Sequence, residues 1–230
     1  MGTHAGTLGG IGTAVGVRRQ EPGREAFVNR EDWDERYGTE ELIWKADPNR
    51  FLVEELDALV PGRALDLACG EGRNAVWLAS KGWHVTGVDF SRAGLAKARR
   101  LATDRGVEAT WVEADVVEWQ PSPASFDVVV VMYLHLPSEQ RRQVLGHAAA
   151  ALAPGGTLLV VGHDASNLLH GTGGPQDPAV LFGPEEIVED LSGLQIERAE
   201  RVTRTVVTDA GEATAFDALV RAVRPSSLRN

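Results

Sequence analysis

The spacing of hydrophobic positions changes repeatedly along the chain, and each change predicts an element. Short apolar runs alternate with longer stretches in which apolar side chains recur every three or four positions, the spacing of an amphipathic helix. Strands are therefore predicted at Ala64–Ala68, His84–Val88, Ala109–Glu113, Phe126–Met132 and Thr157–Gly162. Helices are predicted over Asn74–Ser80 and Ser91–Arg105, from Ser138 to near Pro154–Gly156, and over Pro184–Leu191.

The stretch FDVVVVM at residues 126–132 is apolar on both faces of a strand. This is typical of a central strand in a parallel sheet that helices cover on both sides. Near the end the pattern changes, since Gln195–Val207 and Ala213–Val223 predict two long strands joined by a turn at Thr208–Gly211. The predicted fold class is α/β, a Rossmann-like doubly wound sheet of seven strands with a C-terminal antiparallel hairpin.

The region before the first predicted strand divides into two parts. Residues 1–25 are poor in bulky apolar side chains, so they cannot offset the entropy lost on ordering, and a disordered tail is predicted. Residues 26–60 are predicted to form an N-terminal helical cap, with one helix over Arg30–Trp44 and a second over Pro48–Leu59. Residues 61–230 then form the sheet-containing domain.

The composition narrows the classes of partner and compartment. Hydrophobic residues make up 43% of the chain and charged residues 24%, as in ordinary globular proteins. The net charge of −10 argues against binding to nucleic acid or an anionic membrane, because both need a basic face. A single cysteine excludes an intrachain disulfide, and no apolar run approaches the length of a membrane span. We expect a cytoplasmic monomer or homodimer without a nucleic-acid or membrane partner.

The stretch LDLACGEGRNAVWLA at residues 65–79 joins the first predicted strand to a helix through Gly70-Glu71-Gly72. Glycines at this point let the backbone approach a nucleotide, although such a turn can also join the two elements without any ligand. Asp89 ends the next strand, where a carboxylate can accept hydrogen bonds from ribose hydroxyls. An adenosine-type ligand is therefore predicted, with NAD and S-adenosylmethionine as the two candidates.

Three features favour S-adenosylmethionine. The chain ends in a reversed hairpin instead of a second mononucleotide-binding half. Asp115 ends the third strand, where it can accept a hydrogen bond from an adenine amino group. Glu71 would be repelled by a pyrophosphate, whereas a sulfonium and an ammonium tolerate a nearby carboxylate.

The chain resembles the class I S-adenosylmethionine-dependent methyltransferases over about residues 30–224. The motifs LDLACGEGRNAVWLA, VTGVDFS, VEADVVEW, FDVVVVMYLHLP and LAPGGTLLVVGHD stand in the order and at the spacing of that family. WDERYGTEELIW, PNRFLVEEL and GEGRNAVWLASKGWHVTGVD are further similar to small-molecule methyltransferases of the tellurite-resistance and thiopurine type. The resemblance implies S-adenosylmethionine as cofactor, with S-adenosylhomocysteine as product. It also implies methyl transfer to a small-molecule acceptor through an oxygen, nitrogen or sulfur nucleophile, or to a metalloid anion.

The resemblance also implies roles for single residues. Asp66 would steer the methionine amino group, Asp89 would take the ribose hydroxyls and Phe90 would pack on the adenine. Packing in the core for Phe90 and a purely structural turn bond for Asp66 are the alternatives. The implied cofactor-binding set is Trp33, Arg36, Tyr37, Asp66, Ala68, Gly70, Gly72, Asn74, Asp89, Phe90, Ser91, Ala114, Asp115, Val116, Val131, Met132 and Tyr133.

Two histidines are the candidates for chemistry. Methyl transfer gains mostly from alignment and exclusion of water, and it needs a base only when the acceptor arrives protonated. His135 and His163 follow the fourth and fifth strands, at the sheet edge where ligands bind, so either could be a base, an acceptor-binding residue or a structural loop contact. Together with His170 and Asp164 they match no standard zinc spacing, so no metal site is predicted.

The segment HDASNLLHGTGGPQDP, which starts at His163, is predicted to cover the acceptor pocket together with the helix around Trp33–Trp44. Three competing functions stay open at this point. They are an NAD-dependent oxidoreductase, a cofactor-binding module without turnover, and a methyltransferase acting on nucleic acid or protein.

Overall fold

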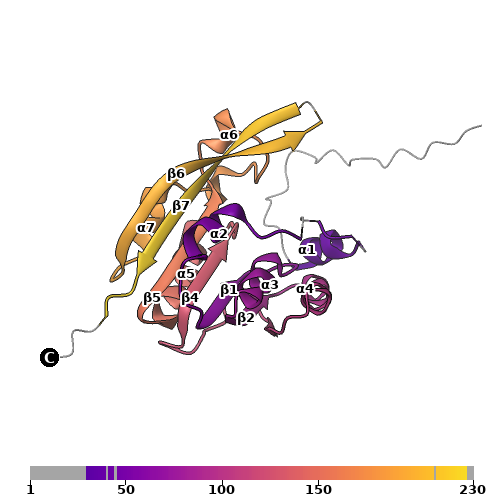
Figure 1. The fold of residues 1–230 in the computed structure, drawn as a ribbon. Coiled ribbons are helices and arrows are strands. Elements are labelled where there is room, and N and C mark those ends of the chain that lie inside the picture. The colour runs from indigo at the N-terminus through magenta and orange to yellow at the C-terminus, as the bar shows by residue number, and fades with distance from the viewer. Residues whose placement is uncertain (1–29, 40, 44–45, 210, 227–230) are drawn as a thin grey trace, which may run out of the picture.

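The structure, a computed structural model, describes residues 30–39, 41–43, 46–209 and 211–226. The predicted tail at residues 1–25 and the first part of the predicted cap lie outside these ranges. One seven-stranded sheet of order β3-β2-β1-β4-β5-β7-β6 organises the described part (Figure 1). Its strands are β1 (Arg63–Leu67), β2 (His84–Asp89), β3 (Thr110–Glu113), β4 (Phe126–Met132), β5 (Leu152–His163), β6 (Gln195–Thr208) and β7 (Gly211–Val223).

The sheet confirms the predicted topology. Strands β1 to β5 run parallel, and β7 pairs antiparallel with both β5 and β6. Successive valines of β4 enter opposite layers, with Val128 and Val130 in one buried cluster and Val129 and Val131 in the other. This alternation explains why FDVVVVM has no polar face.

Helices cover both faces of the sheet. Helices α2 and α3 share the first buried cluster, and α5 and α7 share the second. None of the helices in the described ranges is long and apolar enough to cross a membrane. The helices are α1 (Arg30–Tyr37), α2 (Arg50–Leu56), α3 (Arg73–Ser80), α4 (Arg92–Asp104), α5 (Ser138–Ala151), α6 (Asn167–His170) and α7 (Pro184–Asp190), with a 3-10 turn at Pro178–Val180.

The two cap helices are shorter than the sequence predicts. The helix predicted over Arg30–Trp44 ends at Tyr37, where the amide of Gly38 turns back to the carbonyl of Glu35 at 3.1 Å; Trp44 itself lies outside the described residues. The helix predicted over Pro48–Leu59 spans Arg50–Leu56 instead. Its start is set by Asn49, whose side chain accepts a hydrogen bond from the Phe51 amide.

The fifth strand is longer than predicted. Helix α5 ends at Ala151 and β5 begins at Leu152, so residues 152–156 belong to an irregular strand with a left-handed Gly155 where a helix end was predicted. The Gly155 amide donates to the carbonyl of Arg224, and the Arg224 amide donates to the carbonyl of Gly156, at 2.8 and 2.9 Å. Pairing with the end of the chain therefore extends the strand, and a local pattern does not reveal such a contact.

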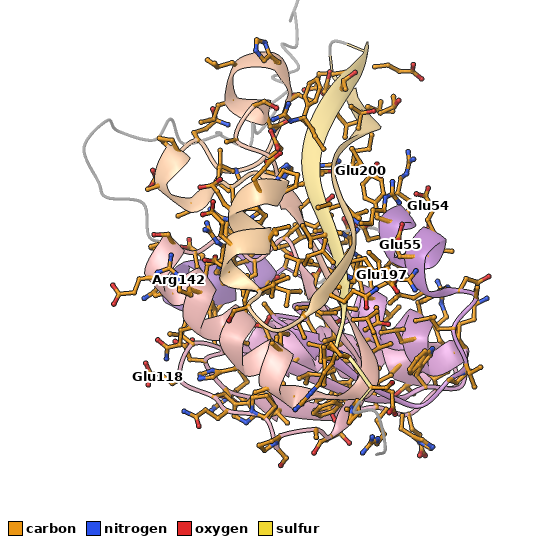
Figure 2. All side chains as sticks on the ribbon, turned by 90° about the vertical axis from the view of Figure 1, so that its left-hand side faces the viewer. Glu54, Glu55, Glu118, Arg142, Glu197 and Glu200 are labelled. Carbon is orange, nitrogen blue, oxygen red and sulfur yellow. The ribbon has the colours of Figure 1, made fainter. Side chains whose placement is uncertain are left out.

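Charged side chains tie α2 to the C-terminal hairpin. Arg198 of β6 pairs with Glu55 of α2, and Arg221 of β7 lies 3.6 Å from Glu55 and 3.0 Å from Glu197. Figure 2 shows Glu55, Glu197 and Glu200 on the same side of the molecule, contributed by α2 and β6. In Figure 1, α2 lies beside the carboxyl ends of β4 and β5 and next to the hairpin.

Candidate active site

The site lies at the carboxyl ends of β1, β2, β4 and β5. Because β1 pairs with β2 on one side and β4 on the other, the order of winding reverses between β1 and β4. Ligands in open α/β sheets bind at such a switch point. Most of the residues predicted from the sequence gather on this edge, and helices α1 and α2 border it (Figure 1).

The turn after β1 needs its two glycines. Gly70 and Gly72 have φ of 53° and 79°, in the left-handed region that favours glycine. A Cβ on Gly72 would lie 2.6 Å from the Cβ of Ala98, and a Cβ on Gly70 would lie 2.7 Å from the Tyr37 hydroxyl. Ala68, also predicted in the site, has φ of 58°, an uncommon value for a residue with a side chain. The turn is therefore strained as well as close-packed.

Asp89 connects this turn to the end of β2. Its Oδ2 accepts a hydrogen bond from the Gly70 amide, and its Oδ1 accepts one from the Ser91 amide, both at 2.8 Å. A carboxylate can accept several hydrogen bonds at once. The residue that the sequence assigned to the ribose thus also holds the turn in shape.

Asp66 is a buried carboxylate next to the glycine turn. It is 1% exposed, and its Oδ2 has no hydrogen-bond partner among the described residues. Burial, and then the charge of Asp89, raises the pKa of Asp66 to about 7. Sequence reasoning missed Arg73, the arginine of GEGRN. Burial lowers the pKa of Arg73, although the charges of Tyr133 and Asp66 partly oppose this effect. Arg73 therefore lies close enough to both residues to interact with them electrostatically.

The ends of β2 and β3 bring the residues assigned to the adenine together. The amide of Ala114 donates to the carbonyl of Asp89 at 3.0 Å. Asp115 is exposed and accepts a hydrogen bond from the Val117 amide at 2.9 Å, while Val116 is buried and Phe90 is half-buried. The Asp115 side chain is therefore accessible from solvent beside Asp89.

Helix α1 is held against the glycine turn by its aromatic side chains. The rings of Trp33 and Tyr37 stack at 5.3 Å, and the exposed Arg36 guanidinium lies 4.9 Å from the centre of the Trp33 ring. Asp34, which sequence reasoning missed, accepts a hydrogen bond from the hydroxyl of Ser91 at the start of α4. Ser91 is therefore the N-cap of α4 and also holds α1 against the start of that helix.

Glu71 has a different role from the one inferred from sequence. Its Oε1 lies 2.9 Å from Nζ of Lys97, and both side chains are 3% exposed. The Ile43 amide donates to Glu71 at 3.0 Å, and Lys97 donates to the carbonyl of Glu41 at 2.6 Å. The buried pair thus binds the segment after α1, and because Lys97 balances its charge, Glu71 does not discriminate a sulfonium from a pyrophosphate.

The side chains of Asn74 and of the three predicted residues at the end of β4 have different surroundings. Asn74 accepts a hydrogen bond from the Asn49 amide at 2.9 Å, which joins α3 to the start of α2. Val131 packs in the cluster with α5 and α7, and Met132 packs in the cluster with α2 and α3. Of the residues at the end of β4, only Tyr133 contacts the charged groups at the sheet edge, and its φ of 58° is uncommon outside glycine.

A second set of side chains meets at Asp217 of β7. The antiparallel register places Asp217 opposite His163 of β5, and the His163 Nδ1 lies 3.2 Å from the Asp217 Oδ1. The other oxygen, Oδ2, accepts hydrogen bonds from the Tyr133 hydroxyl at 2.9 Å and from Nε of Arg204 at 2.7 Å. We call these four residues, Tyr133, His163, Arg204 and Asp217, the hairpin cluster. Sequence reasoning found its tyrosine and histidine, and missed Arg204 and Asp217.

The two predicted catalytic histidines occupy different environments. The rings of His135 and His163 stack at 5.2 Å, and the Nε2 of His135 accepts a hydrogen bond from the His163 amide at 3.1 Å. Burial, and then the charge of His163, lowers the pKa of His135 to about 3. His135 is therefore neutral and engaged with the backbone, whereas the ring of His163 faces a carboxylate.

Part of the segment predicted to cover the acceptor pocket packs on His163. The segment contains α6 and ends at the start of the 3-10 turn, where the sequence predicted only a loop. The side-chain oxygen of Asn167 accepts a hydrogen bond from the Phe216 amide of β7 at 2.9 Å. A Cβ on Gly174 would lie 2.6 Å from the His163 ring, so the backbone of this segment packs on the histidine.

Comparisons with known proteins show which proteins this chain resembles. Residues 64–156 match a family described as a methyltransferase domain. A demethylmenaquinone methyltransferase of Thermus thermophilus is 38% identical over 123 residues, 53% of this chain and 54% of that protein. The chain thus spans about half the length of this relative.

Two solved structures share the fold. TehB from Haemophilus influenzae has a TM-score of 0.65 and 17% identity, covering 85% of this chain and 66% of that one. The N-methyltransferase NodS from Bradyrhizobium japonicum, in complex with S-adenosylhomocysteine, has a TM-score of 0.65 and 19% identity, covering 86% and 98%.

The residues at the sheet edge fit S-adenosylmethionine. The unpartnered Oδ2 of Asp66 suits the methionine ammonium, Asp89 places a carboxylate at the end of β2 where ribose hydroxyls can donate to it, and the glycine turn leaves room for a close approach. Residues 64–156 therefore match a methyltransferase domain, and the fold around them is similar to that of S-adenosylmethionine-dependent methyltransferases.

Proposed function

We propose that this protein transfers a methyl group from S-adenosylmethionine to a small-molecule acceptor, through an oxygen, nitrogen or sulfur atom of that acceptor. The main support for the proposal is that the glycine turn and the hairpin cluster lie at the same edge of the sheet. The glycine turn with Asp66 and Asp89 suits a nucleoside that carries an ammonium. The hairpin cluster beside it holds ionisable groups that the nucleoside does not need.

Binding and alignment account for most of the chemistry. When bound, the cofactor supplies an electrophilic methyl group on a sulfonium. The chain holds the nucleoside through Asp66 and Asp89 and covers the site with α1, α2 and the segment after β5. Fixing two reactants in line can lower the barrier by roughly 7–11 kcal/mol, so the protein needs few groups that react themselves.

We assign the general base to His163 in preference to His135. A base must accept a proton near neutral pH, and a histidine with a pKa of about 3 holds one too weakly. The Nε2 of His135 is also already an acceptor for the His163 amide. His163 has its Nδ1 toward Asp217, and its Nε2 has no hydrogen-bond partner among the described residues.

Charge and enclosure support a small acceptor. The net charge of −10 disfavours a polyanionic substrate such as RNA. The segment around Gly174 packs on His163 and leaves that ring 10% exposed, which suits a small acceptor better than a folded macromolecule. A cofactor-binding module without turnover is the second candidate, because the nucleoside side of the site is complete without the hairpin cluster.

A turnover assay tests the proposal and separates the candidates. The protein is incubated with S-adenosylmethionine and a panel of phenols, thiols and amines, and released S-adenosylhomocysteine is measured. We expect release with part of this panel, and a fall in kcat of about 10²-fold or more in His163→Gln. His135→Gln is the matched control. It should lower the free energy of unfolding, and its kcat should fall less than that of His163→Gln. Cofactor binding without any release would favour the second candidate, and equal kcat losses in both variants would remove the assignment of His163.

A further inference from the structure

The hairpin cluster is built around one buried carboxylate. Asp217 is 0% exposed, and its two oxygens are approached by donors from three other strand regions: Tyr133 after β4, His163 at the end of β5 and Arg204 in β6. A buried carboxylate is costly unless it is paired and hydrogen-bonded. Two hydrogen bonds, from Tyr133 and Arg204, stabilise the anion at this point, and His163 lies within ion-pair distance of its other oxygen.

The surroundings keep Asp217 charged. Burial alone would raise its pKa, but the close His163 ring, the charge of Arg204 and the Tyr133 hydroxyl together hold the pKa below its ordinary value. Burial, and then the charge of Asp217, raises the pKa of Tyr133 to about 12, so the phenol stays protonated and donates. His135, whose pKa burial and the charge of His163 lower to about 3, is neutral beside this anion at neutral pH.

The cluster also fixes which nitrogen of His163 is basic. A carboxylate that faces Nδ1 favours the tautomer with its proton on Nδ1, and this leaves the lone pair on Nε2. The ring is held from both sides, edge-on by Tyr133 at 5.1 Å and by stacking on His135 at 5.2 Å. Arg204 pairs with the Asp217 oxygen that does not face the histidine, so it holds the carboxylate without competing for Nδ1.

We propose that Asp217 is a positioning residue that holds His163 as the general base, and that the methyl acceptor is a phenol or thiol that arrives protonated. This inference rests on the proposed function and narrows its acceptor class. An acceptor that is already anionic, such as a halide or a metalloid oxyanion, needs no base and makes the carboxylate–imidazole pair superfluous. Phenols and thiols have pKa values of about 10 and 8.5, so at neutral pH most of either class is protonated.

In the transfer step, the acceptor proton and the electron pair of the breaking bond each have a defined destination. The acceptor proton passes to Nε2 of His163 as the acceptor oxygen or sulfur forms its bond to the methyl carbon. The bond from that carbon to sulfur breaks, and its electron pair stays on sulfur. The imidazolium that forms is stabilised by Asp217 at Nδ1, and it later releases its proton to solvent.

Histidine NMR tests the positioning role without any acceptor. In protein labelled with ¹⁵N-histidine and bound to S-adenosylhomocysteine, His163 is assigned by the signal lost in His163→Gln. We expect the Nδ1–H tautomer in the wild type, and a fall in the His163 pKa of about 1–3 units in Asp217→Asn, because the anion that favours the imidazolium is gone. The Nε2–H tautomer in the wild type, which is measured even if Asp217→Asn does not fold, would overturn the proposal. So would an unchanged pKa in the folded variant.

A matched control separates this role from a loss of stability. Glu55 is also a buried carboxylate bound by arginines of the hairpin, but it pairs with Arg198 and Arg221 away from His163. Glu55→Gln should destabilise the protein and leave the tautomer and pKa of His163 unchanged. An equal His163 shift in Glu55→Gln would mean that loosening the hairpin explains the effect.

Acceptor acidity tests the second half of the proposal. With substituted phenols and thiols of graded pKa, Asp217→Asn should lower kcat by about 10²-fold or more for acceptors that are protonated at the assay pH. The loss should shrink toward none for acceptors that are already ionised. A loss independent of acceptor pKa, or turnover of anionic acceptors alone, would contradict the assignment.

Calorimetry with S-adenosylhomocysteine is the check on the proposed function itself. Absence of cofactor binding would overturn that function whatever the NMR shows.

Discussion

At the scale of single residues, the site combines groups that the sequence reveals with groups that it does not. Asp89 and Gly70 are predictable because a strand end and a glycine turn are local features, and the structure joins them by a hydrogen bond of 2.8 Å. Asp217 and Arg204 are not predictable in this way, because they lie in alternating strand segments where charged residues usually face solvent. Only the β5–β7 register places Asp217 opposite His163.

Asp66 should lower the free energy of unfolding in a pH-dependent way, and a substitution should remove this effect. Its pKa of about 7 is raised by burial and then by the charge of Asp89, so between about pH 4 and 7 the folded protein holds a proton that the unfolded chain has lost. Stability should therefore fall as pH rises through this window. Asp66→Asn should be more stable than the wild type near pH 8 by roughly 4 kcal/mol, and the difference should shrink toward pH 4.

Urea unfolding at about pH 5 and pH 8 measures this difference. Asp115→Asn is the control, because that carboxylate is exposed at the same sheet edge. A stability difference between Asp66→Asn and the wild type that is the same at both pH values would show that Asp66 does not titrate in this window.

At the scale of elements, buried ion pairs decide how the N-terminal segments sit on the sheet. The strand pattern and the helices between strands follow from hydrophobic spacing, and the structure confirms them. The shortened cap helices do not follow from spacing, because the segment after α1 is held by Glu71 and Lys97 across the chain instead of by helix bonds. A helical pattern of apolar residues cannot show that competing contact.

Breaking this pair from one side should be costly. Lys97→Met leaves Glu71 as a buried, uncompensated charge and should lower the free energy of unfolding by about 3–5 kcal/mol. The double variant Glu71→Gln with Lys97→Met should recover much of that loss, since no lone charge is left. Chemical denaturation gives the values, with Glu54→Gln in the exposed Arg50–Glu54 pair as a control that should cost less than about 1 kcal/mol. Equal losses in the single and the double variant would argue against a buried pair.

At the scale of the whole molecule, the fold brings two sets of side chains to one edge. The parallel half of the sheet builds the proposed nucleoside site from local motifs, and for this reason a sequence pattern finds it. The hairpin adds Arg204 and Asp217 through long-range pairing, so the ionisable half of the site becomes visible only when the complete sheet is assembled.

The sequence also predicts that the first residues contribute little to this assembly. Removing residues 1–25 should change Tm by less than about 2 °C and leave the affinity for S-adenosylhomocysteine unchanged, because a sequence poor in bulky apolar side chains can bury little surface. Differential scanning calorimetry and a binding titration of the shortened chain measure both. A large fall in either quantity would mean that this segment closes over the site.

The most direct test of the central claim is a calorimetric titration of the wild type with S-adenosylhomocysteine and, separately, with NADH. The account predicts saturable binding of S-adenosylhomocysteine and none of NADH. Asp89→Ala should weaken that binding tenfold or more, since bonds to a charged group contribute roughly 1.5–3 kcal/mol. Asp127→Asn, a carboxylate paired with Arg63 at the opposite edge of the sheet, should bind like the wild type. Binding of NADH instead, or full affinity in a folded Asp89→Ala protein, would contradict the account.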